Sequence, residues 1–151
     1  MLKRHLLMNK KSLIVFLGLS TFAFGQVSKT VSYFPLNKVA LSESIFSRAM
    51  QTDKNYIMSM DADRLLAPYL KEAGLNPKKP NYPNWENTGL DGHIGGHYIS
   101  ALALMYASTG DVKVKQRLDY MIDELERCQN LSGNGYISGI PDGKKIWKEI
   151  S

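Results

Sequence analysis

Cysteine is nearly absent from this chain, because Cys128 is the only one among 151 residues. An internal disulfide framework of the kind that staples small secreted domains is therefore excluded. Without such staples, a stable fold needs a sizeable hydrophobic core. Cys128 lies on a predicted helix without a cysteine neighbour, which is more typical of a buried packing residue than of a nucleophile.

Long apolar runs are missing as well. The run over residues 13–24 covers about 12 residues, whereas roughly 20 are needed to span a bilayer. Four cations precede it (Lys3, Arg4, Lys10 and Lys11), and small residues at Ala23 and Gly25 follow. This pattern predicts a secretory signal peptide over residues 1–25, and hence a periplasmic or secreted protein without stable membrane insertion. A retained membrane anchor is the alternative.

A charge excess is missing once the signal is set aside. The chain has 19 Lys and Arg against 14 Asp and Glu, but four of the cations and none of the anions precede Gln26. The remaining balance is 15 against 14, so the basic pI reflects targeting. We therefore expect no nucleic-acid partner and no binding to anionic membranes.

The first half of residues 26–151 predicts two helices and a long loop. Apolar side chains recur at helical spacing over residues 44–60. Asp61 should cap a second helix and Gly74 should end it, with Pro68 breaking or kinking it between. Residues 75–96 contain three prolines and four glycines without an apolar period, which predicts an irregular loop. Loops this long are usually functional or disordered, and the aromatic residues favour function.

The second half predicts a helical hairpin. Residues 96–109 are apolar nearly all round, which indicates an inner helix buried on both sides. Gly110 should end this helix and Asp111 should cap the next, an outer helix with one apolar stripe made of Val114, Leu118, Met121, Ile122 and Leu125. A glycine-rich return, residues 133–141, follows. An inner helix, an outer helix and such a return form the repeat of an α/α toroid. The predicted fold class is therefore all-α, a partial (α/α)6 six-hairpin toroid.

Four blocks then carry a resemblance to a known family: "DADRLLAPYLKEAGL", "NWENTGLDGHIGGHYISALALMYASTGD", "RLDYMIDELERCQ" and "GNGYISGIP". In this order they resemble the amino-terminal part of bacterial β-L-arabinofuranosidases of glycoside hydrolase families 127 and 146. The resemblance implies a six-hairpin catalytic barrel that begins within residues 26–151. It also implies the release of terminal L-arabinofuranose from plant oligosaccharides, polysaccharides or glycoproteins.

The resemblance further implies an unusual mechanism. A zinc-bound cysteine thiolate serves as nucleophile and a glutamate as general acid/base, where most glycosidases pair two carboxylates. Zinc keeps the thiol deprotonated at neutral pH. No residue of this chain matches those positions, so we assign no catalytic residue and no metal ligand here and expect them after residue 151. Because the last residues, "DGKKIWKEIS", begin an amphipathic helix without a terminal cap, we expect a truncated and inactive fragment.

Five residues are candidate substrate ligands: Trp85, Glu86, His93, His97 and Tyr136. The glycines around His93 and His97 should let the backbone approach a ligand, with His97 in the first turn of the inner helix and His93 just before it. The imidazoles are candidates for sugar hydroxyls, for structural bonds within the loop, or for metal ligands. Against the metal interpretation, Gly95 and Gly96 weaken the helical spacing between them, and no third ligand is nearby in the sequence.

The other candidates have alternatives too. Trp85 suits stacking on a sugar face or plugging the loop against the barrel. Glu86 suits accepting a hydroxyl, orienting His97, or capping and bracing the loop. Asp91 suits a loop brace through its own backbone. Tyr136 should reach the same end of the barrel.

Two other functions fit the predicted fold, because an α/α toroid does not decide the reaction. One is another carbohydrate-active enzyme, an unsaturated glucuronyl hydrolase or a polysaccharide lyase. The other is a carbohydrate-binding protein without catalysis.

Overall fold

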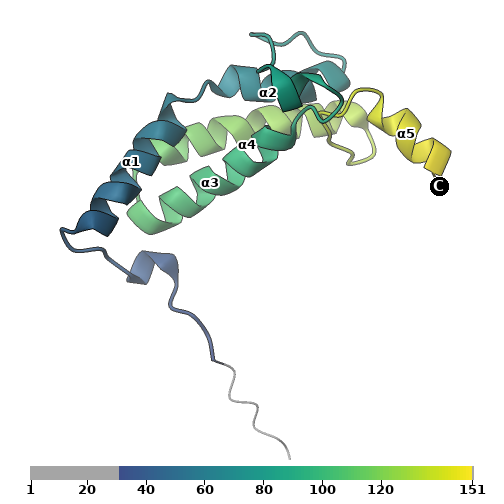
Figure 1. Ribbon diagram of the computed structural model, residues 1–151. Coiled ribbons are helices and arrows are strands. Elements are labelled where there is room, and N and C mark those ends of the chain that lie inside the picture. Colours follow the sequence, from purple (N-terminus) through teal and green to yellow (C-terminus); the bar gives the residue numbers. More distant parts are fainter. Residues whose placement is uncertain (1–30, 151) are drawn as a thin grey trace, which may run out of the picture. The chain divides into compact units, whose positions relative to one another are not determined.

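The computed structural model of the chain describes residues 31–150, so the predicted signal peptide over residues 1–25 lies outside the described residues. The chain divides into two units, residues 1–33 and 34–151, and the second holds every helix described here. Its elements are η1 (Leu36–Lys38), α1 (Ile45–Ser59), α2 (Ala62–Glu72), η2 (Asn84–Asn87), α3 (His93–Thr109), α4 (Val112–Ser132) and α5 (Gly143–Ile150) (Figure 1). Residues 31–150 contain no strand, which confirms the all-α class.

α1 and α2 begin where their capping residues predict. Ser44 and Ser47 form a reciprocal capping box at the start of α1. The Asp61 carboxylate accepts the Asp63 N–H at the start of α2, and Gly74, with φ of +76°, follows its end. Both helices therefore satisfy part of their unpaired terminal groups with local side chains or with glycine geometry.

Of the break or kink expected at Pro68, the break is wrong, because α2 runs without interruption from Ala62 to Glu72. Pro68 has no N–H to donate to the carbonyl four residues back, and this costs a helix about 3 kcal/mol. The side chain is fully buried among neighbouring segments. Packing of the proline ring therefore offsets the lost hydrogen bond, an effect that local propensity does not include.

α3 and α4 form the predicted hairpin, lying side by side with a short link between them (Figure 1). Gly110, with φ of +65°, ends α3, and the Asp111 carboxylate accepts the N–H groups of Lys113 and Val114 at the start of α4. Asp111 also forms a 2.8 Å ion pair with Lys54 of α1. One residue therefore caps α4 and ties the hairpin to α1.

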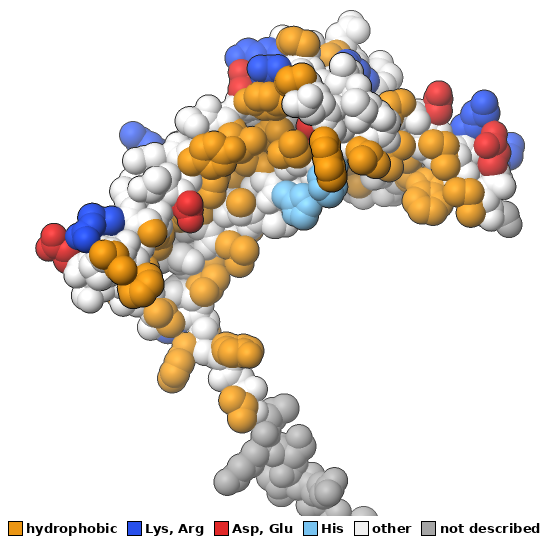
Figure 2. Space-filling view, viewed as in Figure 1, with side chains coloured by type: hydrophobic (Ala, Val, Ile, Leu, Met, Phe, Trp, Pro, Cys, Tyr) orange, Lys and Arg blue, Asp and Glu red, His pale blue; other side chains and the backbone are white. Residues whose placement is uncertain are grey.

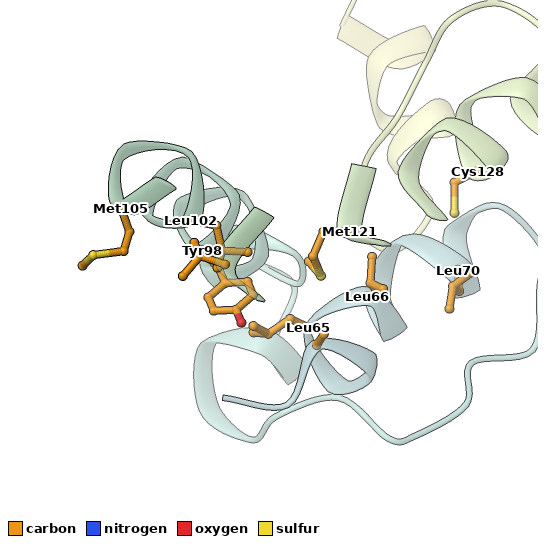
Figure 3. Packing of buried hydrophobic residues seen from close by; sticks show 10 residues of the cluster. Leu65, Leu66, Leu70, Tyr98, Leu102, Met105, Met121 and Cys128 are labelled. Carbon is orange, nitrogen blue, oxygen red and sulfur yellow. The ribbon is translucent and has the colours of Figure 1, made fainter. Parts of the chain in front are cut away.

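The core lies where α2 packs against both helices of the hairpin. Leu65 and Leu66 of α2 point toward Tyr98 and Leu102 of α3 and Met121 of α4 (Figure 3). Leu65, Leu66, Leu102 and Met121 have no exposed surface. Complete burial of each such side chain contributes about 1.5–3 kcal/mol. These contacts fix α3 relative to α2, and so fix the start of α3, where the candidate residues lie.

The expectation that α3 is buried on both sides is wrong within residues 31–150. Its buried residues, Gly95, Tyr98, Leu102 and Met105, line one face. Leu104 on another face is 59% exposed, since no described element packs there. The stripe of α4 is also narrower than predicted, because Ile122 lies outside the core and is exposed. Within residues 31–150 no helix has the length and apolar character to cross a membrane.

Candidate functional site

α3 starts three residues earlier than the periodicity predicts, and a buried carboxylate explains the difference. Glu86 of η2 has no exposed surface, and its two oxygens accept the Gly92 N–H at 2.9 Å and the Ile94 N–H at 2.6 Å. N–H groups at a helix start have no partner within the helix, so a carboxylate there can accept their hydrogen bonds. Its negative charge also interacts favourably with the positive end of the helix dipole. Glu86 thus acts as a helix cap supplied from the preceding loop, which is one of the roles considered for it.

Asn81 and Asp91 hold Glu86 in place. The Asn81 side-chain amide donates to the Glu86 backbone carbonyl at 2.7 Å and to the Asp91 carboxylate at 3.0 Å. The other Asp91 oxygen accepts the Gly89 N–H at 3.0 Å, so Asp91 braces the loop through local backbone as predicted. We call Asn81, Glu86 and Asp91 the loop brace. All three are buried, so the loop over residues 75–92 is an ordered support for α3.

The glycines of this region allow the chain to pack against itself. A Cβ on Gly95 would lie 2.8 Å from the Tyr69 ring and 3.0 Å from the Leu65 carbonyl oxygen. The Tyr69 hydroxyl donates to the Gly92 carbonyl, and burial, followed by the nearby Glu86 carboxylate, raises the pKa of Tyr69 to about 12. The sequence predicts that these glycines leave space for a ligand, whereas in the structure the Tyr69 side chain fills the space at Gly92 and Gly95.

The return after α4 reaches the same end of the hairpin. A Cβ on Gly139 would lie 2.8 Å from both the Asp91 carbonyl oxygen and the Gly92 Cα, so the two backbones are in direct contact. A hollow of about 280 Å³ forms at this contact, lined by residues 90–93 and 137–140 together with Tyr69. Its volume is near the lower end of small-molecule sites, which begin at roughly 300 Å³.

An exposed group of three rings meets the hollow through His93, the one ring of the three that lines it. The ring centroids of Trp85 and His93 are 5.6 Å apart, and those of His93 and His97 are 4.7 Å apart and edge-to-face. We call Trp85, His93 and His97 the ring cluster; the two histidines lie side by side on the exposed face, beside apolar side chains (Figure 2). Within residues 31–150 neither imidazole has a hydrogen-bond partner, and both histidines are exposed.

The positions of both histidines differ from the prediction. His93 is the first residue of α3 and His97 lies in its second turn, because Gly95 and Gly96 are helical. The helical spacing between the imidazoles is therefore intact, whereas the sequence argued that two glycines would weaken it. Glycine lowers helix propensity, but the Glu86 cap and the Tyr69 contact stabilise this turn.

Tyr136 does not join the ring cluster. Its hydroxyl lies over Gly143, where an added Cβ would approach it to 2.1 Å, and Lys144 lies 5.9 Å from its ring centroid. The return itself does contact the start of α3, but through residues 137–140. The loop was correctly placed, and the side chain within it faces the start of α5.

A comparison with protein families identifies the chain that carries this site. The protein-family model described as "Beta-L-arabinofuranosidase, GH127 catalytic domain" matches residues 38–149. The chain belongs to this family. The GH127 chain is therefore a glycoside hydrolase of the β-L-arabinofuranosidase kind, and its substrate is a carbohydrate. No curated relative matches it.

The zinc and thiolate chemistry that the resemblance implies does not fit the described residues of this GH127 chain. Among residues 31–150, no three His, Cys, Asp or Glu side chains come together as a metal-binding group. Cys128 is 2% exposed on α4, and burial raises the pKa of its thiol. A buried, protonated thiol is a poor nucleophile and a poor metal ligand. Cys128 is thus a packing residue, as its isolation in the sequence indicates.

Three residues that support the site were not predicted: Tyr69, Asn81 and Gly139. Each contacts a residue that is distant in the sequence of the GH127 chain: Tyr69 and Gly139 contact Gly92, and Asn81 donates to Asp91. Asn81 and Tyr69 belong to no recognisable sequence motif, and the sequence predicts Gly139 only as part of the glycine-rich return. The glycine content of both loops was the available signal, because backbones without side chains can approach each other closely.

Proposed function

We propose that the chain is the amino-terminal part of an exported β-L-arabinofuranosidase that releases terminal L-arabinofuranose from plant-derived glycans. The α3–α4 hairpin is one repeat of its (α/α)6 toroid. Family membership supports the reaction class, and the inner and outer helix pattern supports the toroid. Export rests on the predicted signal peptide over residues 1–25.

The observation that carries the site is the ring cluster beside the hollow. Trp85 is 58% exposed, which leaves much of its indole surface open to a ligand. Sugar C–H groups pack well on an aromatic face, and imidazole nitrogens both donate to and accept from hydroxyls. We assign stacking to Trp85 and hydroxyl binding to His93 and His97.

The remaining candidates are not assigned to the sugar. Glu86 uses both carboxylate oxygens to hold the start of α3, so it positions His93 and His97 rather than binding a hydroxyl itself. Tyr136 is left out of this assignment, because its side chain faces the start of α5 and the hollow is lined by residues 137–140 of the same return. The catalytic thiolate, the acid/base glutamate and the zinc ligands belong to residues outside the range 31–150.

The test uses an active catalytic domain that contains this segment. His97→Ala should lower kcat/KM on an aryl β-L-arabinofuranoside by about 10²- to 10³-fold, roughly 3 to 4 kcal/mol, because hydroxyl bonds strengthen in the transition state. Trp85→Ala should mainly raise KM, because stacking stabilises ground state and transition state alike.

Melting temperatures of the same samples distinguish a residue that binds the sugar from one that only stabilises the fold. Trp147→Phe is the matched control for Trp85, since Trp147 is also 58% exposed but lies on α5. A His97→Ala enzyme with lowered melting temperature and unchanged kcat/KM would contradict the assignment of the ring cluster to the sugar.

A further inference from the structure

The two imidazoles of the ring cluster lie one helical turn apart. α3 begins at His93, so His93 and His97 occupy positions i and i+4 and share one face of the helix. Their ring centroids are 4.7 Å apart, with the ring planes at 81°. Both side chains are exposed, and in the described part of the chain their nitrogens have no competing hydrogen bond.

This separation matches two ligands of one metal ion. An imidazole nitrogen binds a first-row divalent ion at about 2.1 Å, which puts each ring centroid about 3.2 Å from the ion. With an angle of about 90–110° between the two bonds, the centroids would lie about 4.5–5.2 Å apart. The observed 4.7 Å falls in this range, so the separation of the two rings suits chelation when one nitrogen of each ring is turned toward a shared ion.

The charge around the start of α3 does not oppose a cation. A helix amino terminus carries about half a positive charge, which disfavours a metal ion nearby. Here the Glu86 carboxylate accepts the N–H groups of Gly92 and Ile94, so a full negative charge lies against that terminus. The carboxylate outweighs the helix dipole at this position.

We propose that His93 and His97 chelate one divalent transition-metal ion, with water completing its coordination. Imidazole suits Cu²⁺, Ni²⁺ and Zn²⁺, and Cu²⁺ binds most tightly in this series. The site is separate from zinc and cysteine chemistry, because it uses no thiol. A second consequence rests on the proposed function: an ion held by these nitrogens excludes the sugar, so the metal inhibits the enzyme by competition.

The experiment uses the whole chain without a histidine tag and with Trp147→Phe, which leaves Trp85 as its only tryptophan. Because the Trp85 ring lies 5.6 Å from that of His93, a bound Cu²⁺ should quench its fluorescence. Titration with Cu²⁺ should give saturable quenching at one ion per chain. His93→Gln and His97→Gln, compared at equal helix content by circular dichroism, should each weaken binding at least about tenfold, because chelation by the second ligand is lost.

The outcomes are distinct. If Cu²⁺ quenches both single variants and the double variant as strongly as the unaltered chain, the proposed metal site is wrong. Quenching that is lost in the variants establishes it. A saturating methyl β-L-arabinofuranoside should then raise the Cu²⁺ concentration at half-quenching; an unshifted midpoint would overturn the competition and the sugar assignment, while the metal site would stand.

Discussion

Removing the charge of Glu86 should destabilise the chain although the substitution is nearly isosteric. In Glu86→Gln one side-chain oxygen remains to accept either the Gly92 or the Ile94 N–H. The new NH₂ group then faces the other N–H, so two donors meet in a site with no exposed surface. In Glu86→Ala both N–H groups lose their partner, and a cavity replaces the side chain.

The magnitude follows from the two bonds. A hydrogen bond to a charged group contributes about 1.5–3 kcal/mol, and a buried donor left without a partner costs about 1–3 kcal/mol. We therefore expect Glu86→Gln to lower the free energy of unfolding by about 2–3 kcal/mol and Glu86→Ala by about 3–5 kcal/mol. These are large fractions of a total of about 5–15 kcal/mol.

Urea unfolding followed by far-UV circular dichroism measures the effect. With a slope of about 2 kcal/mol per molar urea, Glu86→Gln should lower the midpoint by about 1 M. Amide hydrogen exchange at Gly92 and Ile94 should accelerate, because local opening at the start of α3 becomes easier. Glu126→Gln is the matched control: Glu126 is exposed on α4, and its loss should cost less than about 0.5 kcal/mol.

One result would refute this reasoning. If Glu86→Gln unfolds within about 0.5 kcal/mol of the unaltered chain and the exchange of the Gly92 and Ile94 amides is unchanged, the carboxylate is not the cap of α3.

Other predictions follow from the same region and from the exposed surfaces. Gly95→Ala should lower the free energy of unfolding by about 1–3 kcal/mol because the new Cβ meets the Tyr69 ring, whereas Gly96→Ala should be neutral or add up to about 1 kcal/mol, its nearest neighbour being the Tyr69 hydroxyl at 3.8 Å. Urea midpoints that rank the two variants in the opposite order would contradict the packing. Because the pKa of Tyr69 is about 12 in the folded chain against 10.0 unfolded, its stabilisation is complete below pH 10 and is lost as pH rises toward 12. Urea midpoints across that range should fall less steeply in Tyr69→Phe. The exposed apolar surface around Leu104 should make the chain self-associate as its concentration rises, which sedimentation velocity would detect. A monomer at every concentration would show that this surface does not drive self-association. Because residues 31–150 hold no group of three metal-binding side chains and the Cys128 thiol is buried, we expect this chain by itself not to hydrolyse an aryl β-L-arabinofuranoside with or without zinc; hydrolysis that disappears in Cys128→Ser would show that the buried thiol is a nucleophile.

Local signals in the sequence predicted the helices well. Asp61 and Asp111 cap α2 and α4, and Gly74 and Gly110 follow the ends of α2 and α3, because each of these effects depends on a few neighbouring residues. Periodicity also placed α1 within one residue at each end.

Effects that depend on distant partners were not predictable in the same way. The continuity of α2 through Pro68 depends on packing against the return, and the early start of α3 depends on a cap from Glu86. The sequence also left open whether the glycines near His93 make room for a ligand or for the chain. Tyr69 filled that space, and nothing in its local sequence indicated so.

The direct contact between Gly92 and Gly139 joins segments that are far apart in the chain. A side chain at Gly139 would meet Asp91, Gly92 and Pro68 simultaneously, each at 2.8 Å. It would therefore push on the first turn of α3, which carries His93, and on the α2 segment beneath it. The orientation of the ring cluster is therefore set partly by a residue in another loop, 46 positions after His93 in the sequence. A search for variants with altered sugar preference could begin at Gly139 as reasonably as at the histidines.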